Sequence, residues 1–369
     1  MSLADIARSV NASVNRRGIV KRRHQGWLPR LTPYAGYGST AALKVLARAT
    51  MVDPNAGSSL SDLSFLPRGM HSLPAGPVRD IAQAAADAGA EAQRGWHQFF
   101  TTQVGFLPVT VRIGEREIHT RTDREGYIDL LVEDHGLTPG WHKVELIPKV
   151  GEPVEAPIMI VAPDVRRGLI SDIDDTIVVT WLPRAFLAAW NAFVLHTNAR
   201  QPVSGMADFY DKLLAPTPNA PVFYVSTGAW NTYPTLLRFL HQHRYPIGPM
   251  LMTDWGPTPT GLFRNGEAHK KAQLRNLLIM FPNIEWVLVG DDGQHDPIIY
   301  DELAREHPSR VAAIALRELN PLEQVLSHGT IDPAESNRED EDIERHGVPV
   351  IRGGDGEILA LRAKASGLF

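Results

Sequence analysis

Cysteine is absent from this chain of 369 residues, and its absence excludes several kinds of site. Without a thiol there is no disulfide, no thiolate metal ligand and no cysteine nucleophile. A zinc site is also unexpected, because the neighbouring residues His241 and His243 have no cysteine and no second ligand pair nearby. The lack of cysteine does not by itself assign the protein to a compartment.

Long apolar runs are missing as well. No stretch approaches the length needed to cross a bilayer, and residues 1–30 lack the apolar core of a signal peptide. The net charge of −5 is mild and gives no reason to expect a nucleic-acid partner. With 43% hydrophobic and 21% charged residues, the composition is that of a soluble chain long enough for two domains. We therefore expect a cytoplasmic protein.

Charge is unevenly distributed between the two ends of the chain. In residues 1–30 Asp5 is the only acidic residue, and the basic residues are Arg8, Arg16, Arg17, Lys21, Arg22, Arg23 and Arg30. Such a segment favours peripheral contact with an anionic membrane, although a solvated, mobile terminus has the same composition. Residues 326–369 begin with an acidic stretch, interpreted as a linker or tail, and continue with apolar runs at 348–351 and 358–361 that predict a small hairpin.

Residues 31–164 are rich in strand-like runs. Three of them, at 106–113, 126–132 and 141–147, are separated by turn residues. Together with a strand near 43–51, their spacing predicts a β-sandwich domain, with an Ala-rich helix inserted at about 78–92. We expect this domain to act as a scaffold or to dock on a membrane or a partner.

The most informative segment begins at residue 169, where an apolar strand ends in two carboxylates and a hydroxyl. Asp172 and Asp174 are two residues apart, and Thr176 follows them. On an extended strand the two carboxylates share one face, and a turn at the strand end lets them converge on one small volume. One carboxylate can then attack phosphorus while the other handles the proton of the leaving group.

A second strand, at 221–225, ends in Ser226, Thr227 and Gly228. A hydroxyl followed by small residues at a strand tip can bind a phosphate oxygen through its own oxygen and nearby backbone N–H groups. The alternative interpretation is that Ser226 only caps a helix.

Two further segments follow in order. A helix with apolar spacing begins near Lys270 and Lys271, and a lysine there can reach a phosphoryl group as a point charge. A third strand, at 286–289, ends in an acidic stretch that includes Asp291, and carboxylates there suit Mg²⁺. The four segments in this order are a far stronger signal together than any one of them.

The four segments resemble the four motifs of the haloacid dehalogenase superfamily. The wider spelling, SDIDDTI, STGAWN, AHKKAQL and VGDDGQHDPIIY, is similar to the catalytic domain of the actin-patch-type phosphatidate phosphatases. The similarity covers about residues 165–320, with a weaker echo at residues 33–38. This chain has Gly228 and Ala229 where many relatives have a Ser-Pro pair.

The resemblance implies a role for each of these residues. Asp172 would be the nucleophile that forms an aspartyl-phosphate, and Asp174 would be the general acid and then the general base. Lys270 would neutralise charge, with Lys271 as the alternative. The substrate-binding residues would be Thr176, Ser226, Thr227 and Gly228.

The resemblance also implies a Mg²⁺ site. Asp172, the backbone carbonyl of Asp174 and the carboxylate of Asp291 would bind the ion. Asp296 would support the metal through a ligand residue or a water, and Asp292 is the alternative for that role.

The predicted fold is α/β. A Rossmann-like catalytic domain of the haloacid dehalogenase type, with a mostly parallel sheet, would span residues 165–325 and follow the β-sandwich domain. The segment at 181–190 is long enough for one helix or a flap but not for a folded cap domain, so the cap would be minimal. The loop at 255–264 is a candidate for substrate specificity, with a plain structural loop as the alternative.

The predicted function is Mg²⁺-dependent hydrolysis of phosphomonoesters, with a phosphatidate-like lipid as the favoured substrate. An open site suits a large or membrane-embedded substrate. A phosphatase acting on a soluble metabolite or a phosphoprotein is one alternative. A non-catalytic membrane-docking module is another, and the complete acid set Asp172, Asp174 and Asp291 argues against it.

Overall fold

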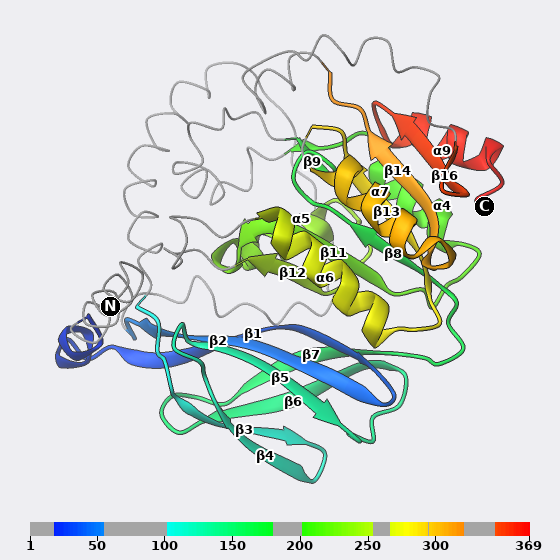
Figure 1. Cartoon of the computed structure of the whole chain (residues 1–369). Helices are drawn as coiled ribbons and strands as arrows, with labels where there is room; N and C mark the ends of the chain where they lie inside the picture. Colours follow the sequence, from blue (N-terminus) through cyan, green and yellow to red (C-terminus); the bar gives the residue numbers. More distant parts are fainter. Residues whose placement is uncertain (1–17, 55–101, 180–200, 254–265, 294, 321–343) are drawn as a thin grey trace, which may run out of the picture.

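The structure is a computed structural model that describes residues 18–54, 102–179, 201–253, 266–293, 295–320 and 344–369. Two seven-stranded sheets dominate it, one N-terminal and one in the remainder of the chain (Figure 1). The expected helix at 78–92, the segment at 181–190 and the loop at 255–264 lie outside the described residues. Within the described ranges, none of the helices combines the length and apolar character that a membrane crossing requires.

The N-terminal sheet has the strand order β4-β3-β6-β7-β1-β2-β5. Neighbours are antiparallel except for β1 and β7, which are parallel. Its strands are β1 (Leu28–Ser39), β2 (Ala42–Val52), β3 (Pro108–Ile113), β4 (Arg116–Arg121), β5 (Tyr127–Glu133), β6 (Gly140–Pro148) and β7 (Val154–Val161). The strands predicted from the sequence in this region are therefore confirmed.

This sheet folds over so that its two edges approach each other. The guanidinium of Arg116, at the start of β4, donates to the carbonyl oxygens of Glu133 and Asp134, at the end of β5, at 2.8 and 3.1 Å. Buried side chains from β2, β3, β5 and β6 form one apolar cluster. The expected sandwich is thus one continuous, curved sheet, an arrangement compatible with sandwich-like packing.

The second sheet has the strand order β12-β11-β8-β13-β14-β16-β15, and all its pairs are parallel except β15 with β16. Its strands are β8 (Arg167–Ser171), β11 (Val222–Ala229), β12 (Met250–Thr253), β13 (Glu285–Asp291), β14 (Val311–Arg317), β15 (Glu344–Arg345) and β16 (Val348–Gly353). In chain order the parallel strands run 3-2-1-4-5-6, so the order reverses between β8 and β13. Open α/β sheets bind ligands at the carboxyl ends of the strands beside such a reversal.

Helices connect these strands and cover the sheet. They are α4 (Met206–Leu214), α5 (Tyr233–Gln242), α6 (Gly266–Met280), α7 (Asp296–Glu306) and α9 (Gly356–Ala365), with short 3₁₀ turns η3 (Trp230–Thr232) and η4 (Pro308–Arg310). In Figure 1, α6 and α7 lie on one face of the sheet, and α4 and α9 lie together on the other. A two-stranded ribbon of β9 (Val178–Val179) and β10 (Gln201–Pro202) follows the first site segment.

The predicted C-terminal hairpin is wrong. Residues 348–351 belong to β16, which adds to the sheet beside β14, but residues 358–361 belong to helix α9. The carboxylate of Asp355 caps that helix by accepting the N–H of Ile358 at 2.9 Å. The C-terminal segment therefore completes the parallel sheet instead of forming a separate hairpin.

The two sheets share a core. Tyr34 and Tyr37 of β1 belong to the same apolar cluster as the strands and helices of the second sheet. The ring of Tyr37 lies edge-on to Phe223 of β11 at 5.1 Å between centroids, and 6.4 Å from Phe281 at the end of α6. One face of β1 thus packs against the domain that carries the candidate site.

Candidate active site

Asp172 leaves the central strand of the parallel sheet at the point where the strand order reverses. Its N–H donates to the carbonyl oxygen of Val289 on β13 at 2.8 Å, and its side chain is buried. Directly after it the chain turns back, because the N–H groups of Ile177 and Val178 both donate to the carbonyl of Ile173. Asp175 in this turn has a φ of 59°, which the short polar side chain of an aspartate tolerates. Asp174 and Thr176 are thereby held close to the strand end.

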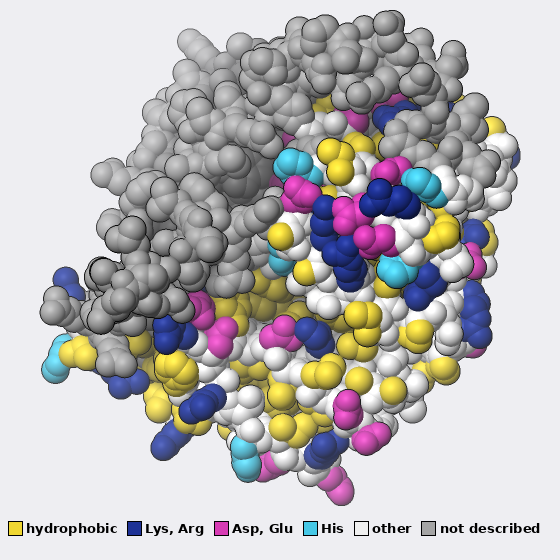
Figure 2. Space-filling model, in the orientation of Figure 1, with side chains coloured by type: hydrophobic (Ala, Val, Ile, Leu, Met, Phe, Trp, Pro, Cys, Tyr) yellow, Lys and Arg dark blue, Asp and Glu magenta, His cyan; other side chains and the backbone are white. Residues whose placement is uncertain are grey.

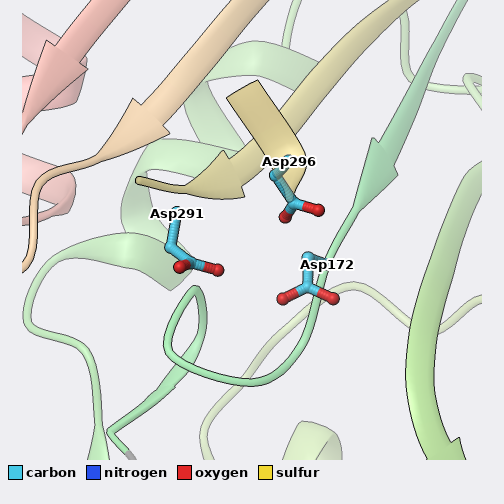
Figure 3. A group of neighbouring side chains, drawn as sticks. All are labelled: Asp172, Asp291 and Asp296. Carbon is cyan, nitrogen blue, oxygen red and sulfur yellow. The ribbon is translucent and has the colours of Figure 1, made fainter. Parts of the chain in front are cut away.

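Three carboxylates meet at this edge of the sheet (Figure 3). Asp172 follows β8, Asp291 ends β13 and Asp296 begins α7, and one carboxylate oxygen from each lies within 4.8 Å of the others. All three side chains are buried. Segments more than a hundred residues apart thus form one acidic cluster.

Lys270 inserts its ammonium group into this cluster from the buried face of α6. Nζ lies 2.7 Å from Oδ1 of Asp172 and 2.6 Å from Oδ1 of Asp296. Burial acts to lower the pKa of Lys270, but the negative charges of Asp172, Asp296 and Asp291 outweigh burial and raise the pKa above its usual value. The lysine is therefore a fixed positive charge at any physiological pH.

One ammonium does not balance three carboxylates. Burial raises the pKa of Asp172 to about 8, with Lys270 opposing the shift and Asp296 and Asp174 adding to it. Burial likewise raises the pKa of Asp291 well above its ordinary value, and repulsion from Asp296 and Asp172 adds to that shift. With every group ionised, the four side chains carry two net negative charges in a buried space. A divalent cation would offset that charge.

A further observation fits a metal ion at this point. Oδ2 of Asp296 is buried and has no hydrogen-bond partner among the described residues, although a buried carboxylate oxygen normally has one. Gly290 leaves room for this carboxylate, since a Cβ at that position would clash with Oδ2 of Asp296. Oxygen ligands of this kind are those that Mg²⁺ prefers. The donor set therefore fits a hard divalent cation.

Asp174 is bonded to β11 and is not one of the three clustered carboxylates. Ser226 Oγ donates to Oδ2 of Asp174 at 3.0 Å and accepts the N–H of Gly228 at 2.9 Å. Ser226 is fully buried in the second half of β11. Asp172 and Asp174 thus have different partners: one carboxylate faces Lys270, and the other faces a serine hydroxyl.

The other two predicted substrate-binding residues occupy different positions. Thr176 is buried beside the cluster, with Oγ1 3.4 Å from Asp172 Oδ2 and 3.4 Å from Asp291 Oδ2. Thr227 accepts a hydrogen bond at its carbonyl from Thr253 Oγ1 at 2.7 Å, and its side chain lies against Gly266. Thr253, at the end of β12, thereby ties this strand tip to its neighbour.

The structure shows which residue of each alternative pair, Lys270 or Lys271 and Asp296 or Asp292, lies beside Asp172. Lys271 pairs with Glu267 at 2.8 Å and Glu302 at 2.5 Å, within a group of charged side chains over α6 and α7 (Figure 2). The carboxylate of Asp292 accepts the N–H of Leu319 at 2.9 Å and lies outside the three-carboxylate group. Lys270 and Asp296, and not their alternatives, face Asp172.

Two supporting residues were not identified from the sequence. Arg317, at the buried end of β14, donates from Nη1 to the carbonyl of Asp175 at 2.7 Å and braces the turn after Asp172. Tyr210 of α4 shares a hydrogen bond of 2.6 Å with Ser171 Oγ, directly before Asp172. The only sequence signal for Arg317 is an arginine ending an otherwise apolar strand, VAAIALR. Tyr210 gives no such signal, because a helix tyrosine is ordinary core.

Known proteins are similar in sequence to the domain that carries this site. Residues 167–318 match the family model described as "Phosphatidate phosphatase APP1, catalytic domain". The phosphatidate phosphatase APP1 of Saccharomyces cerevisiae is 31% identical over 163 residues, 44% of this chain and 27% of the relative. Uncharacterized protein C29B5.04c of Schizosaccharomyces pombe is 27% identical over 157 residues, 42% of this chain and 26% of the relative. The chain thus spans about a quarter of the length of these curated relatives.

One solved structure has a weak similarity to this chain. The carbohydrate acetylesterase XAC1771 from Xanthomonas citri matches over 62% of this chain and 68% of its own, at 10% identity and a TM-score of 0.23. A similarity at this level carries no inference about fold or function.

The family match covers every strand end and helix start of the site, from Asp172 after β8 to Asp296 at the start of α7. The expected resemblance to the catalytic domain of the actin-patch-type phosphatidate phosphatases is confirmed for these residues. Residues 167–318 therefore match the catalytic domain of the APP1-type phosphatidate phosphatases.

Proposed function

We propose that this protein hydrolyses phosphomonoesters through an aspartyl-phosphate on Asp172, with a phosphatidate-like lipid as substrate. The observation that carries the proposal is the buried cluster of Asp172, Asp291, Asp296 and Lys270 beside the Asp174–Ser226 pair. We also infer that the domain is of the haloacid dehalogenase type. The strand order 3-2-1-4-5-6 and the placement of the four motifs at strand ends and helix starts support this assignment.

The first half of the reaction transfers the phosphoryl group to the enzyme. A carboxylate oxygen of Asp172 attacks phosphorus, the bond from phosphorus to the ester oxygen breaks, and the carboxyl of Asp174 gives its proton to the leaving oxygen. The ammonium of Lys270, 2.7 Å from Asp172, holds this carboxylate in place and neutralises charge near the phosphoryl group.

The second half releases phosphate. Asp174, now ionised, takes a proton from a water molecule whose oxygen attacks phosphorus, and the bond from phosphorus to Asp172 breaks. Ser226 donates to Asp174 at 3.0 Å and can hold its carboxylate in either protonation state. Both aspartates thus return to their starting forms.

Mg²⁺ would be held by the carboxylates of Asp172 and Asp291 and the carbonyl of Asp174, with Asp296 supporting the site. When bound, the ion supplies positive charge that stabilises the phosphoryl oxygens. The unpartnered oxygen of Asp296 and the two uncompensated charges of the cluster support this assignment.

The lipid substrate is proposed from the family match. The S. cerevisiae relative is called a phosphatidate phosphatase, and the family model described by the same name matches residues 167–318, which carry the site. The basic residues of the N-terminal segment are consistent with peripheral contact with an anionic membrane.

The test is phosphate release from phosphatidate in mixed micelles, from sugar phosphates and from an aryl phosphate, with and without Mg²⁺. Asp172→Asn should abolish turnover, and Asp174→Asn should lower kcat on alkyl esters by about 10²–10⁴-fold because proton donation is lost. Asp292→Asn is the matched control, since an amide oxygen can still accept the N–H of Leu319, and its activity should stay close to that of the wild type. Turnover that is unaffected by Asp172→Asn would overturn the proposed mechanism, and preference for a sugar phosphate would replace the lipid.

A further inference from the structure

The contact between the two sheets reaches the segment that follows Ser226. We name residues 226–233 the phosphate loop. Within it, the ring of Trp230 stacks on Tyr34 of β1, with 4.2 Å between centroids and 27° between planes. The ring of Tyr233 lies edge-on to the same tyrosine at 4.9 Å. One residue of the N-terminal sheet therefore touches two residues of the loop.

A hydrogen bond accompanies the ring contacts. The backbone N–H of Ala35 donates to the hydroxyl oxygen of Tyr233 at 3.0 Å. Tyr34, Ala35 and Tyr233 are all buried, so water cannot replace this bond without opening the contact between the domains. Burial raises the pKa of Tyr233 to about 12, so the hydroxyl is neutral under ordinary assay conditions.

A β-bulge in β1 makes this bond available. The pairing with β2 shifts from Tyr34 opposite Leu46 to Tyr37 opposite Lys44, leaving two residues of β1 opposite one residue of β2. An extra residue of this kind is not paired in the ladder and can be aimed elsewhere. Gly36 completes the bulge, because a Cβ there would clash with the backbone of Lys44. Ala35, whose N–H faces the second domain, lies in the bulge, and the rings of Tyr34 and Tyr37 flank it.

The other end of the phosphate loop holds the acid–base carboxylate. Thr232 Oγ1 donates to the carbonyl of Ala229 at 2.8 Å, the N–H of Gly228 donates to Ser226 Oγ, and Ser226 Oγ donates to Asp174. Hydrogen bonds and peptide linkages between chain neighbours thus connect β1, through Tyr233 and Ser226, to Asp174.

We propose that Tyr34 and Tyr233 are positioning residues for Asp174, so that the N-terminal sheet sets the geometry of proton transfer in the second domain. The inference rests on the proposed function, in which Asp174 protonates the leaving oxygen. It gives the N-terminal sheet a direct part in the reaction, beyond scaffolding or docking.

The test uses Tyr233→Phe, which keeps the ring and removes the hydroxyl that accepts the N–H of Ala35. An alkyl phosphate depends on proton donation, whereas an aryl phosphate has a good leaving group and depends on it much less. We expect kcat to fall about tenfold on the alkyl ester and by no more than about twofold on the aryl ester, because a small displacement of an aligned group is costly. Tyr34→Leu, which removes the stacked ring but stays apolar, should change the ratio of the two rates in the same direction.

Tyr224→Phe is the matched control. It also removes a buried tyrosine hydroxyl from the second domain, one that donates to the carbonyl of Pro246 at 2.8 Å and touches no residue of the loop through that bond. Both rates should stay within about twofold of the wild type in this variant. Equal losses on the two esters in Tyr233→Phe, or the same pattern in Tyr224→Phe, would overturn the inference.

Amide hydrogen exchange of Gly228 gives a readout that needs no turnover. Its N–H is bonded to Ser226 Oγ, so a loosened loop should exchange it faster in Tyr233→Phe and leave it unchanged in Tyr224→Phe. Unchanged exchange in Tyr233→Phe would contradict the positioning role. A wild-type protein that is inactive on every ester would overturn the proposed function alone, and the exchange measurement would still decide whether β1 fixes the loop.

Discussion

Lys270 is the residue on which the charge balance of the site depends. It pairs with Asp172 and Asp296 while almost completely buried, and Asp291 adds a third carboxylate to the same space. Removing one partner from a buried ion pair is costly because the remaining charges lose their compensation. The neighbouring Lys271, whose two ion pairs lie near the surface, offers a comparison within the same helix turn.

We predict that Lys270→Met lowers the free energy of unfolding by about 3 kcal/mol and abolishes turnover. Lys271→Met should change the free energy of unfolding far less, since solvent-accessible ion pairs contribute little. Urea denaturation of both variants without added metal measures the difference. Similar losses of stability in the two variants would show that the buried ion pairs of Lys270 contribute no more than the accessible ion pairs of Lys271.

The pKa of Asp172 gives a pH dependence whose sign follows from burial. The pKa is about 8 in the folded, metal-free protein and has an ordinary value of 3.8. Between these values the folded protein holds a proton that the unfolded chain has lost, so stability falls as pH rises from the ordinary value toward the folded one.

With metal removed by a chelator, the free energy of unfolding should therefore decrease from pH 5 to pH 8, by at most about 1.4 kcal/mol per pH unit for one such proton. Asp172→Asn should make this slope shallower. Denaturant titrations at several pH values measure it, and a free energy that rises over the same interval would contradict the assignment.

The sequence could predict which residues gather at the site but not how each one faces. Asp172, Ser226 and Asp291 follow apolar strands, and parallel strands end at one edge of a sheet, so their proximity follows from the pattern. Lys270 and Lys271 are consecutive on a helix, and spacing alone does not say which one points inward. The orientation of α6 against β11 decides it, and that orientation depends on packing across the whole sheet.

At the scale of elements, the C-terminal segment shows why short apolar runs are ambiguous. The run ILAL at 358–361 fits a strand or a helix equally well by hydrophobicity. The hairpin prediction did not take into account that Asp355 can cap a helix and that Glu357 suits its first turn, and the structure has α9 there. The strand β16 could not be assigned to the parallel sheet from the sequence, because its partner β14 lies more than thirty residues upstream.

The contact between α4 and α9 leads to a sharp prediction at Gly356. Its N–H donates to the carbonyl of Ser204, and a Cβ there would clash with backbone atoms of Gly205 and Met206. Because backbone atoms cannot move aside as a flexible side chain can, Gly356→Ala should lower the free energy of unfolding by about 2 kcal/mol or more. At Gly354, two residues away, a Cβ would come no closer than 3.9 Å to another atom. Gly354→Ala should change the free energy of unfolding by no more than about 1 kcal/mol. Thermal denaturation of both variants measures the two changes. A larger loss of stability in Gly354→Ala than in Gly356→Ala would refute the account.

At the scale of the whole molecule, the two sheets are joined by aromatic side chains of β1. Tyr34 and Tyr37 pack against α5, β11 and the end of α6 and belong to the core of the second domain. The apolar residues of β1 in the sequence indicate that the strand has a buried face. They do not indicate that another domain covers this face. The shared core therefore had to be seen in the structure.

We predict that this shared core makes the two domains unfold together. Tyr37→Ala should lower the free energy of unfolding by about 3–5 kcal/mol, since it empties a fully buried site, and should separate the unfolding of the two domains. Leu131→Ala, at a half-exposed position of β5, is the control and should leave a single transition. Calorimetry measures both, and two separate transitions in the wild type would contradict the prediction.

The most direct test of the central claim is to trap the phosphorylated enzyme. The protein would be quenched in acid during turnover of the best substrate from the panel, reduced with borohydride, which converts an acyl phosphate to homoserine, and digested for mass spectrometry. The account predicts a substrate-dependent homoserine in place of Asp172 and at no other aspartate. Steady turnover with Asp172 unmodified, or with the modification at Asp291, would contradict it.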